Sequence, residues 1–118
     1  SWNDGDGLMI GILEEDELSS VKVLAFFFFQ IRHIESSIRA VKAILAMYPK
    51  DIWARAMLVR CFDALENYQS VIDVTDDMML FDSNPEIKKS MALLRARAMQ
   101  KLGRNEDVRK ILSEIGMN

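Results

Sequence analysis

The chain has 118 residues, a length that suits one domain with a core of ordinary size. Half of the residues are apolar, 28% are charged, and five Gly and two Pro are few helix breakers, so the composition favours helices over strands. A net charge of −3 excludes a general attraction to nucleic acid or anionic lipid, and a single cysteine excludes a disulfide framework. We expect a protein of the cytoplasm or the nucleus.

Residues 1–16 form an acidic segment that we expect to be flexible and separate from a helical domain over 17–118. This segment contains the apolar stretch LMIGIL at 8–13, but no basic region precedes that stretch, so a secretory signal is not indicated. The longest apolar run, residues 23–29, has seven residues and includes four consecutive phenylalanines. A helix needs about 20 apolar residues to cross a bilayer, so this run does not predict a membrane span.

Apolar residues fall at helical spacing along most of the chain. The helix 34–48 carries one apolar stripe, whereas 51–65 is apolar over a wide arc and should contact two neighbours. Turns of two or three residues within each pair require consecutive helices to pack antiparallel. The predicted helices cover residues 17–31, 34–48, 51–65, 68–81, 85–102 and 105–115.

Capping residues mark several of these boundaries. Asp51 can accept hydrogen bonds from the first turn of the third helix, and Asn84 stands before Pro85 at the start of the fifth. Asn105 is expected to cap the last helix in the same way, with two acidic residues following it. Gly116 suits the left-handed residue that ends a helix.

Aligning the helical pairs reveals an internal repeat with steps of 34 and then 37 residues. The alignment places Phe28, Phe62 and Met99 in one column. The three additional residues of the second step fall near the linker FDSNPE, residues 81–86. A repeat of this length and helical pattern predicts stacked hairpins that share a core.

The repeat resembles the tetratricopeptide (TPR) family, whose unit is a 34-residue helical hairpin. Leu24 and Ala25 stand at the family's Leu and small-residue positions, Phe28 at an aromatic position and Pro49 at the closing proline. The stretches LENYQSVI (65–72) and LGRNEDV (102–108) resemble the turn of the family unit. A generic helical bundle or another α-solenoid is the alternative. The chain departs from the family at four positions: Arg32 and Glu66 replace the turn glycine, Val59 replaces a small residue, and Arg95 replaces a leucine.

The resemblance implies an all-α fold of three antiparallel hairpins, stacked as a short right-handed solenoid. It also implies a non-enzymatic scaffold whose concave groove binds a peptide or amphipathic helix that carries apolar and acidic residues. A small chaperone for a type III secretion needle or translocator subunit is the alternative function. The terminal helices need a cover, which oligomerisation, the N-terminal segment or further repeats could supply. The residues expected to bind the partner are Lys22, Phe26, Phe29, Trp53, Arg60, Leu93, Arg97 and Lys101.

Four successive phenylalanines cannot all enter one face of a helix, because each residue turns by about 100°. By the family's pattern, Phe28 packs inside its own hairpin and Phe27 faces the adjoining pair. Phe26 and Phe29 then line the groove. Two alternatives remain for the side chains of Phe26 and Phe29. They are covered by residues 1–16 or by another domain, or they form an aromatic floor that binds a partner.

Catalysis is not expected, and we predict no cofactor or metal. His33 is the only histidine and lies in a predicted turn, far in sequence from Cys61, so neither a catalytic pair nor a zinc site is indicated. Residues 4–15 place acids at positions like those of a calcium loop, but Met9 stands where such loops need glycine.

Overall fold

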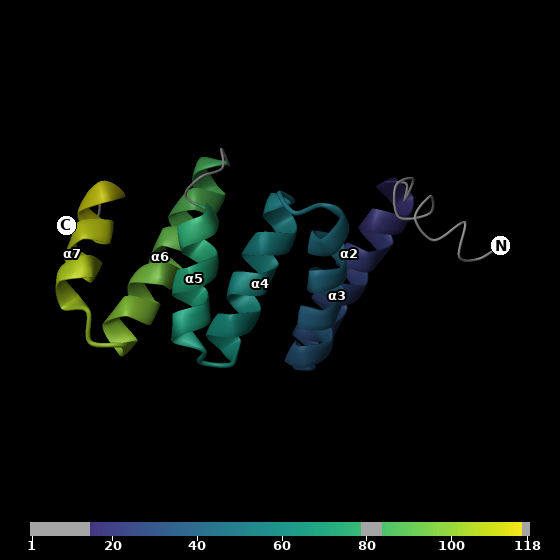
Figure 1. Cartoon of the computed structure of the whole chain (residues 1–118), viewed down its shortest axis with the longest axis horizontal. Helices are drawn as coiled ribbons and strands as arrows, with labels where there is room; N and C mark the ends of the chain where they lie inside the picture. The colour runs from purple at the N-terminus through teal and green to yellow at the C-terminus, as the bar shows by residue number, and fades with distance from the viewer. Residues whose placement is uncertain (1–14, 79–83, 117–118) are drawn as a thin grey trace.

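The computed structural model describes residues 15–78 and 84–116, and these residues form six α-helices and no strand (Figure 1). The all-α prediction is therefore confirmed for the described residues. The predicted end of the fourth helix at residue 81, and all but the last two residues of the segment 1–16, lie outside them. The helices are α2 (Glu15–Gln30), α3 (Ile34–Met47), α4 (Ile52–Ala64), α5 (Tyr68–Met78), α6 (Pro85–Lys101) and α7 (Asn105–Glu114).

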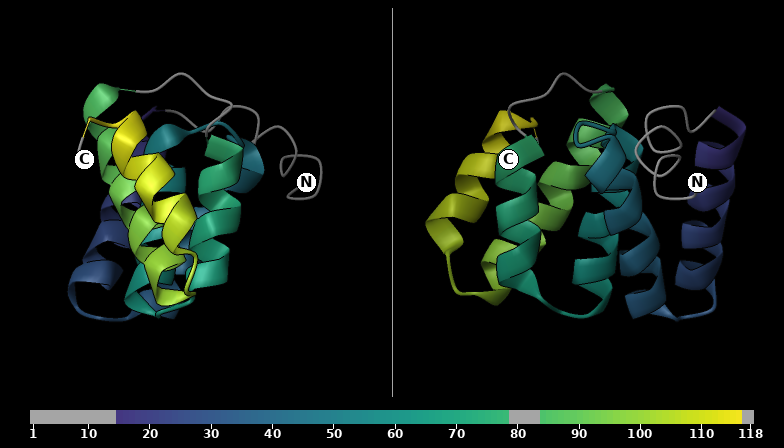
Figure 2. Two further views of the ribbon diagram at one scale, coloured as in Figure 1. Left: turned by 90° about the vertical axis from the view of Figure 1, so that its left-hand side faces the viewer. Right: turned by 45° about the vertical axis from the view of Figure 1, so that its right-hand side comes forward.

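The helices stand side by side in chain order, with α2 and α7 at opposite ends of the row (Figures 1 and 2). The molecule is elongated, with dimensions of 56 × 29 × 20 Å. Each helix packs against the next one along the chain, and α4 additionally contacts both α2 and α6. The helices α2, α4 and α6 therefore form one continuous layer, which positions the candidate site described below.

Two of the predicted caps are confirmed. Asp51 Oδ1 accepts a hydrogen bond of 2.8 Å from the backbone N–H of Ala54, and Asn84 Oδ1 accepts one of 2.7 Å from Glu86. Asn105 is not the cap of α7, because it already lies in the first turn. Arg104 occupies the N-cap position instead; it makes no side-chain capping bond, and its Nε donates to Asp107 Oδ2 at 2.8 Å.

The turns within the three hairpins share one backbone conformation. Arg32, Glu66 and Gly103 are left-handed, with φ of 67°, 58° and 78°. In each turn the next residue donates its N–H to a carbonyl five residues earlier, over 2.8 to 2.9 Å. The left-handed residues follow the sequence steps of 34 and 37, so the internal repeat is present in the backbone although two of its members are not glycine.

The core consists of two clusters that meet on α4. Val59 of α4 packs with residues of α5, α6 and α7, whereas Met57 of α4 packs with residues of α2 and α3. A buried polar chain reinforces the second cluster: Cys61 Sγ donates to Ser37 Oγ at 3.5 Å, and Ser37 Oγ donates to the carbonyl of Ala25 at 2.7 Å. The wide apolar arc of α4 thus contacts two neighbours, as its sequence predicts.

The four phenylalanines of α2 differ in their surroundings. Phe29 is half-buried and packs against the core cluster of α2, α3 and α4, and Phe28 is also half-buried. Phe26 and Phe27 are 43% and 52% exposed. The prediction that Phe27 faces an adjoining pair is wrong for the described residues, because its side chain is 52% exposed and belongs to neither core cluster. Its ring is tilted against that of Phe28, with 6.1 Å between the centroids.

Candidate functional site

Three adjoining hollows lie along the layer of α2, α4 and α6, and we call this surface the α2–α4–α6 groove. The largest, of about 500 Å³, lies among all three helices, and two smaller ones of about 230 and 140 Å³ lie between α4 and α6. Arg60 lines every one of them. The largest hollow is lined by Phe29, Arg32, Arg60, Asp63, Ala64, Ser90, Leu93 and Leu94.

The groove has an apolar floor. Phe29 contributes a half-buried ring from α2, Leu93 a 38% exposed side chain from α6, and Trp53 a half-buried indole from α4. Phe26 is exposed on α2 but lines none of the three hollows. Of the four apolar residues predicted to bind a partner, the structure therefore places three on the hollows and leaves Phe26 outside their lining.

Lys22 already has partners within the fold. Its Nζ lies 2.8 Å from Asp51 Oδ2 and 5.6 Å from the centroid of the Trp53 ring. Both charged side chains are largely buried, with 25% and 15% exposure. The ammonium group therefore links α2 to the first turn of α4, and a ligand would have to compete with Asp51 for it.

Arg97 on α6 faces Asp63 on α4. Arg97 Nε lies 3.5 Å from Asp63 Oδ1, which is an ion-pair distance, but that oxygen is buried and accepts no hydrogen bond among the described residues. Arg97 itself is half exposed. Asp63 lines the largest hollow, so the groove contains a carboxylate oxygen with an unused capacity to accept a hydrogen bond.

Arg60 differs from these two cations. Arg60 is exposed, and its side chain forms no hydrogen bond or ion pair with the residues that the structure describes. Lys101 is exposed at the end of α6 and lines none of the hollows. The four predicted cations therefore differ. Lys22 is paired with Asp51 and Arg97 with Asp63, whereas Arg60 is open to the groove and Lys101 lines none of its hollows.

Sequence reasoning missed several residues of the groove. Arg32, Ile87 and Leu94 line its hollows, although none was expected to bind a partner. Arg32 stands in the turn after α2 and was considered only as a departure from a turn glycine. A sequence signal for Ile87 and Leu94 existed, since they lie seven residues apart with Ser90 three residues after Ile87, a spacing that places all three on one face of the helix.

Cys61 and His33, the two residues whose side chains could act as a nucleophile or a base, lie in surroundings that do not favour those roles. Cys61 is fully buried, and burial raises the pKa of its thiol above the ordinary value of 9.0, while the hydrogen bond with Ser37 acts in the opposite direction. The reactive thiolate is therefore disfavoured at neutral pH. His33 is exposed in the first turn. Among residues 15–78 and 84–116, no cluster of His, Cys, Asp or Glu could hold a metal ion.

Comparison with known proteins finds no matching family model, no similar curated protein and no similar solved structure. Within the described part of the chain, no helix combines the length and apolar character needed to cross a bilayer. The case for a function therefore rests on the geometry of the groove.

Proposed function

We propose that the chain is a protein–protein interaction scaffold, built as a short right-handed stack of three TPR-like hairpins, that acts in the cytoplasm or the nucleus without catalysis. Three equivalent left-handed turns support this stack. The contacts of α2 with α4 and of α4 with α6 also support it, because stacked hairpins bring their first helices together.

The observation that carries the proposed function is the position of Arg60. Arg60 has no side-chain partner among residues 15–78 and 84–116, and it lines three adjoining hollows whose floor is apolar. A guanidinium group in a partly desolvated surface forms strong bidentate contacts with a carboxylate. The groove would therefore bind a peptide or amphipathic helix in which an acidic residue accompanies apolar anchors.

The largest hollow suggests how such a ligand is oriented. Its volume of about 500 Å³ can accept an apolar side chain against Phe29 and Leu93, with Arg32 and Arg60 at its rim for an acidic neighbour. Asp63 Oδ1 could accept a hydrogen bond from a backbone N–H of the ligand, which would satisfy this buried oxygen. In this arrangement the burial of apolar side chains provides the affinity for the ligand, and the charged contacts fix the orientation of the ligand in the groove.

A chaperone for an aggregation-prone secretion subunit is a second candidate, favoured by the exposed rings of Phe26 and Phe27. The two functions differ in the behaviour of the isolated protein. A scaffold is expected to remain monomeric, whereas a chaperone of this kind should self-associate until its client is present. Sedimentation velocity over a range of concentrations separates them.

The experiment that tests the proposed function is a selection of peptides from a random library on the immobilised protein. We expect the selected peptides to combine apolar residues with Asp or Glu. Affinities of the selected peptides are then measured by fluorescence anisotropy for three proteins: the original chain, Arg60→Glu and Leu93→Asp. Both substitutions should weaken binding at least tenfold, because each changes a residue that lines the largest hollow.

Two matched controls lie outside the groove. Arg109→Glu reverses an exposed charge on α7, and Leu102→Asp changes a side chain that is 44% exposed, close to the 38% of Leu93. Both controls should leave peptide affinity within about twofold. Equal losses in groove and control variants, or a library that yields no binders, would contradict the proposal.

A further inference from the structure

The first helix of each hairpin has an equivalent apolar face. The equivalence follows the repeat, so that a residue of α2 corresponds to the residue 34 positions later in α4 and to one a further 37 positions later in α6. The three sets are Val23, Leu24 and Phe27 on α2, Met57, Leu58 and Cys61 on α4, and Leu94, Arg95 and Ala98 on α6.

In α4 and α6 this face packs against the preceding hairpin. Met57, Leu58 and Cys61 are 0 to 7% exposed and belong to the core cluster shared with α2 and α3. Ala98 is fully buried, and Arg95 donates hydrogen bonds to the carbonyl of Ile72 and to Thr75 Oγ1 on α5. The repeat therefore uses this face for contact between hairpins.

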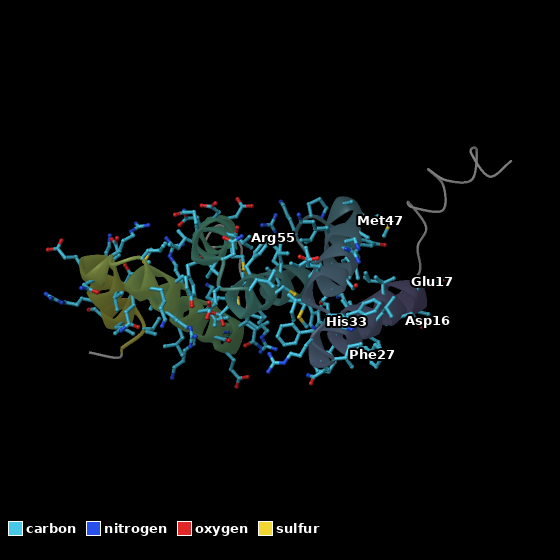
Figure 3. All side chains as sticks on the ribbon, turned by 90° about the horizontal axis from the view of Figure 1, so that it is seen from below. Asp16, Glu17, Phe27, His33, Met47 and Arg55 are labelled. Atoms are coloured by element: carbon cyan, nitrogen blue, oxygen red, sulfur yellow. The ribbon has the colours of Figure 1, made fainter. Side chains whose placement is uncertain are left out.

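In α2 the same face is exposed. Val23, Leu24 and Phe27 are 67%, 47% and 52% exposed, and Ile31 continues the row with 43%. We call these four residues the open face of α2. Figure 3 shows Phe27 at the end of the molecule that carries α2. The equivalent faces of α4 and α6 are each covered by the preceding hairpin. A contiguous exposed apolar surface at the same position on α2 therefore indicates a binding partner.

We propose that the occupant of the open face is the chain's own apolar segment 8–13, LMIGIL, folded back along α2. The segment contains five large apolar residues, and only Glu14 separates it from Glu15, where the described structure begins. Val23 and Phe27 lie about 12 and 18 Å from the start of α2, at 1.5 Å per residue. Six extended residues span roughly 20 Å, so the segment reaches both side chains.

The charges favour an antiparallel arrangement. Asp4 and Asp6 precede the apolar segment, and a chain that returns along α2 brings them toward its C-terminal end. Arg32 and His33 are exposed at that end. The opposite orientation cannot occur without a longer connection, because only one residue lies between the segment and the first residue of α2.

A second copy of the chain fits the open face less well. The outward surface of α7, at the other end of the row, exposes Arg109, Lys110, Ser113 and Glu114, so a head-to-tail contact would place these polar side chains on apolar ones. A symmetric pairing of two open faces would leave segment 8–13 without a cover. The intramolecular contact covers both apolar surfaces and avoids the entropy cost of association.

A double-mutant cycle on the full chain tests this contact. The variants are Ile10→Ala, Phe27→Ala and the double variant, and the readout is the urea midpoint of unfolding. We expect each single change to lower the midpoint, and the double variant to unfold close to the Phe27→Ala variant, because Ile10 has lost its contact there. The matched pair Ile10→Ala and Leu102→Ala, at the far end of the row, should show additive effects.

Two further measurements keep the outcome decisive. Nuclear Overhauser contacts between the Phe27 ring and methyl groups of residues 8–13 should be present in the full chain, and its sedimentation mass should equal one chain at all concentrations. Additive effects of Ile10→Ala and Phe27→Ala would overturn the proposal. A dimer whose urea midpoint falls on dilution would also overturn it, and would assign the open face to a second copy.

Discussion

Lys22 on α2 forms an ion pair of 2.8 Å with Asp51, the residue whose other carboxylate oxygen caps α4. One side chain thus fixes the start of α4 and joins it to the preceding hairpin. The pair crosses 29 residues of sequence and lies mostly out of water, with side-chain exposures of 25% and 15%. Lys22 consequently contributes to the hairpin contact more directly than to a ligand site.

The two contributions of Asp51 can be separated by substitution. Asp51→Asn keeps an oxygen that can cap α4 but removes the charge, so we expect a loss of about 0.5–1 kcal/mol of unfolding free energy. Asp51→Ala removes both, for a total of about 2 kcal/mol. Urea unfolding at low and high salt checks this, since only the ion-pair part should decrease with salt. Equal losses for Asn and Ala would show that the cap contributes nothing.

The left-handed turns make a second prediction. Glu66 has φ of 58°, so Glu66→Gly should stabilise the fold by about 0.5 kcal/mol, because relief of the left-handed strain is partly offset by the greater freedom of glycine when unfolded. Gly103→Ala should destabilise by about 1 kcal/mol. A Cβ at Gly103 would meet no atom within 4 Å, so the expected loss is purely conformational. Thermal unfolding measures both, and a change of the same sign in the two variants would contradict the shared turn.

Local sequence patterns predicted the helices because each one depends on its own spacing of apolar residues and on adjacent caps. Asn105 was wrongly expected to cap α7, because the helix begins one residue earlier: the carbonyl of Arg104 already accepts the N–H of Val108, so Arg104 occupies the N-cap position. The pairing of Lys22 with Asp51 could not be predicted, because it depends on how two hairpins pack. The exposure of Phe27 depends on the same packing, since its equivalent Cys61 is buried by a preceding hairpin.

Cys61 makes stability depend on pH. Burial raises the pKa of its thiol in the folded state, so the folded chain holds this proton more strongly than the unfolded chain does. The stabilisation is fully present below the unfolded pKa and is lost as pH rises through 9 and above. The difference in unfolding free energy between the original chain and Cys61→Ala should therefore narrow between pH 8 and 10. The comparison with Cys61→Ala isolates the thiol because the two proteins differ only there, and a constant difference across this range would contradict the prediction.

Arg97 and Arg60 should respond differently to neutralisation. Arg97 is already paired with Asp63, whereas Arg60 has no partner among the described residues. We expect Arg60→Gln to weaken the binding of a selected acidic peptide about tenfold and to reduce its salt dependence. Arg97→Gln should change the affinity less than threefold. Titrations at two salt concentrations provide the comparison, and a larger loss for Arg97→Gln would reverse the assignment of the two arginines.

The most direct test of the groove is nuclear magnetic resonance mapping of a selected peptide on the isotopically labelled chain. Backbone shifts on binding should concentrate at Arg60, Asp63 and Leu93 and in their neighbours on α2, α4 and α6. Residues on α3 and on the outer face of α7 should remain unchanged. Shifts concentrated on α3, α5 or α7, with Arg60 and Leu93 unaffected, would contradict the account that this groove is where the chain binds another protein.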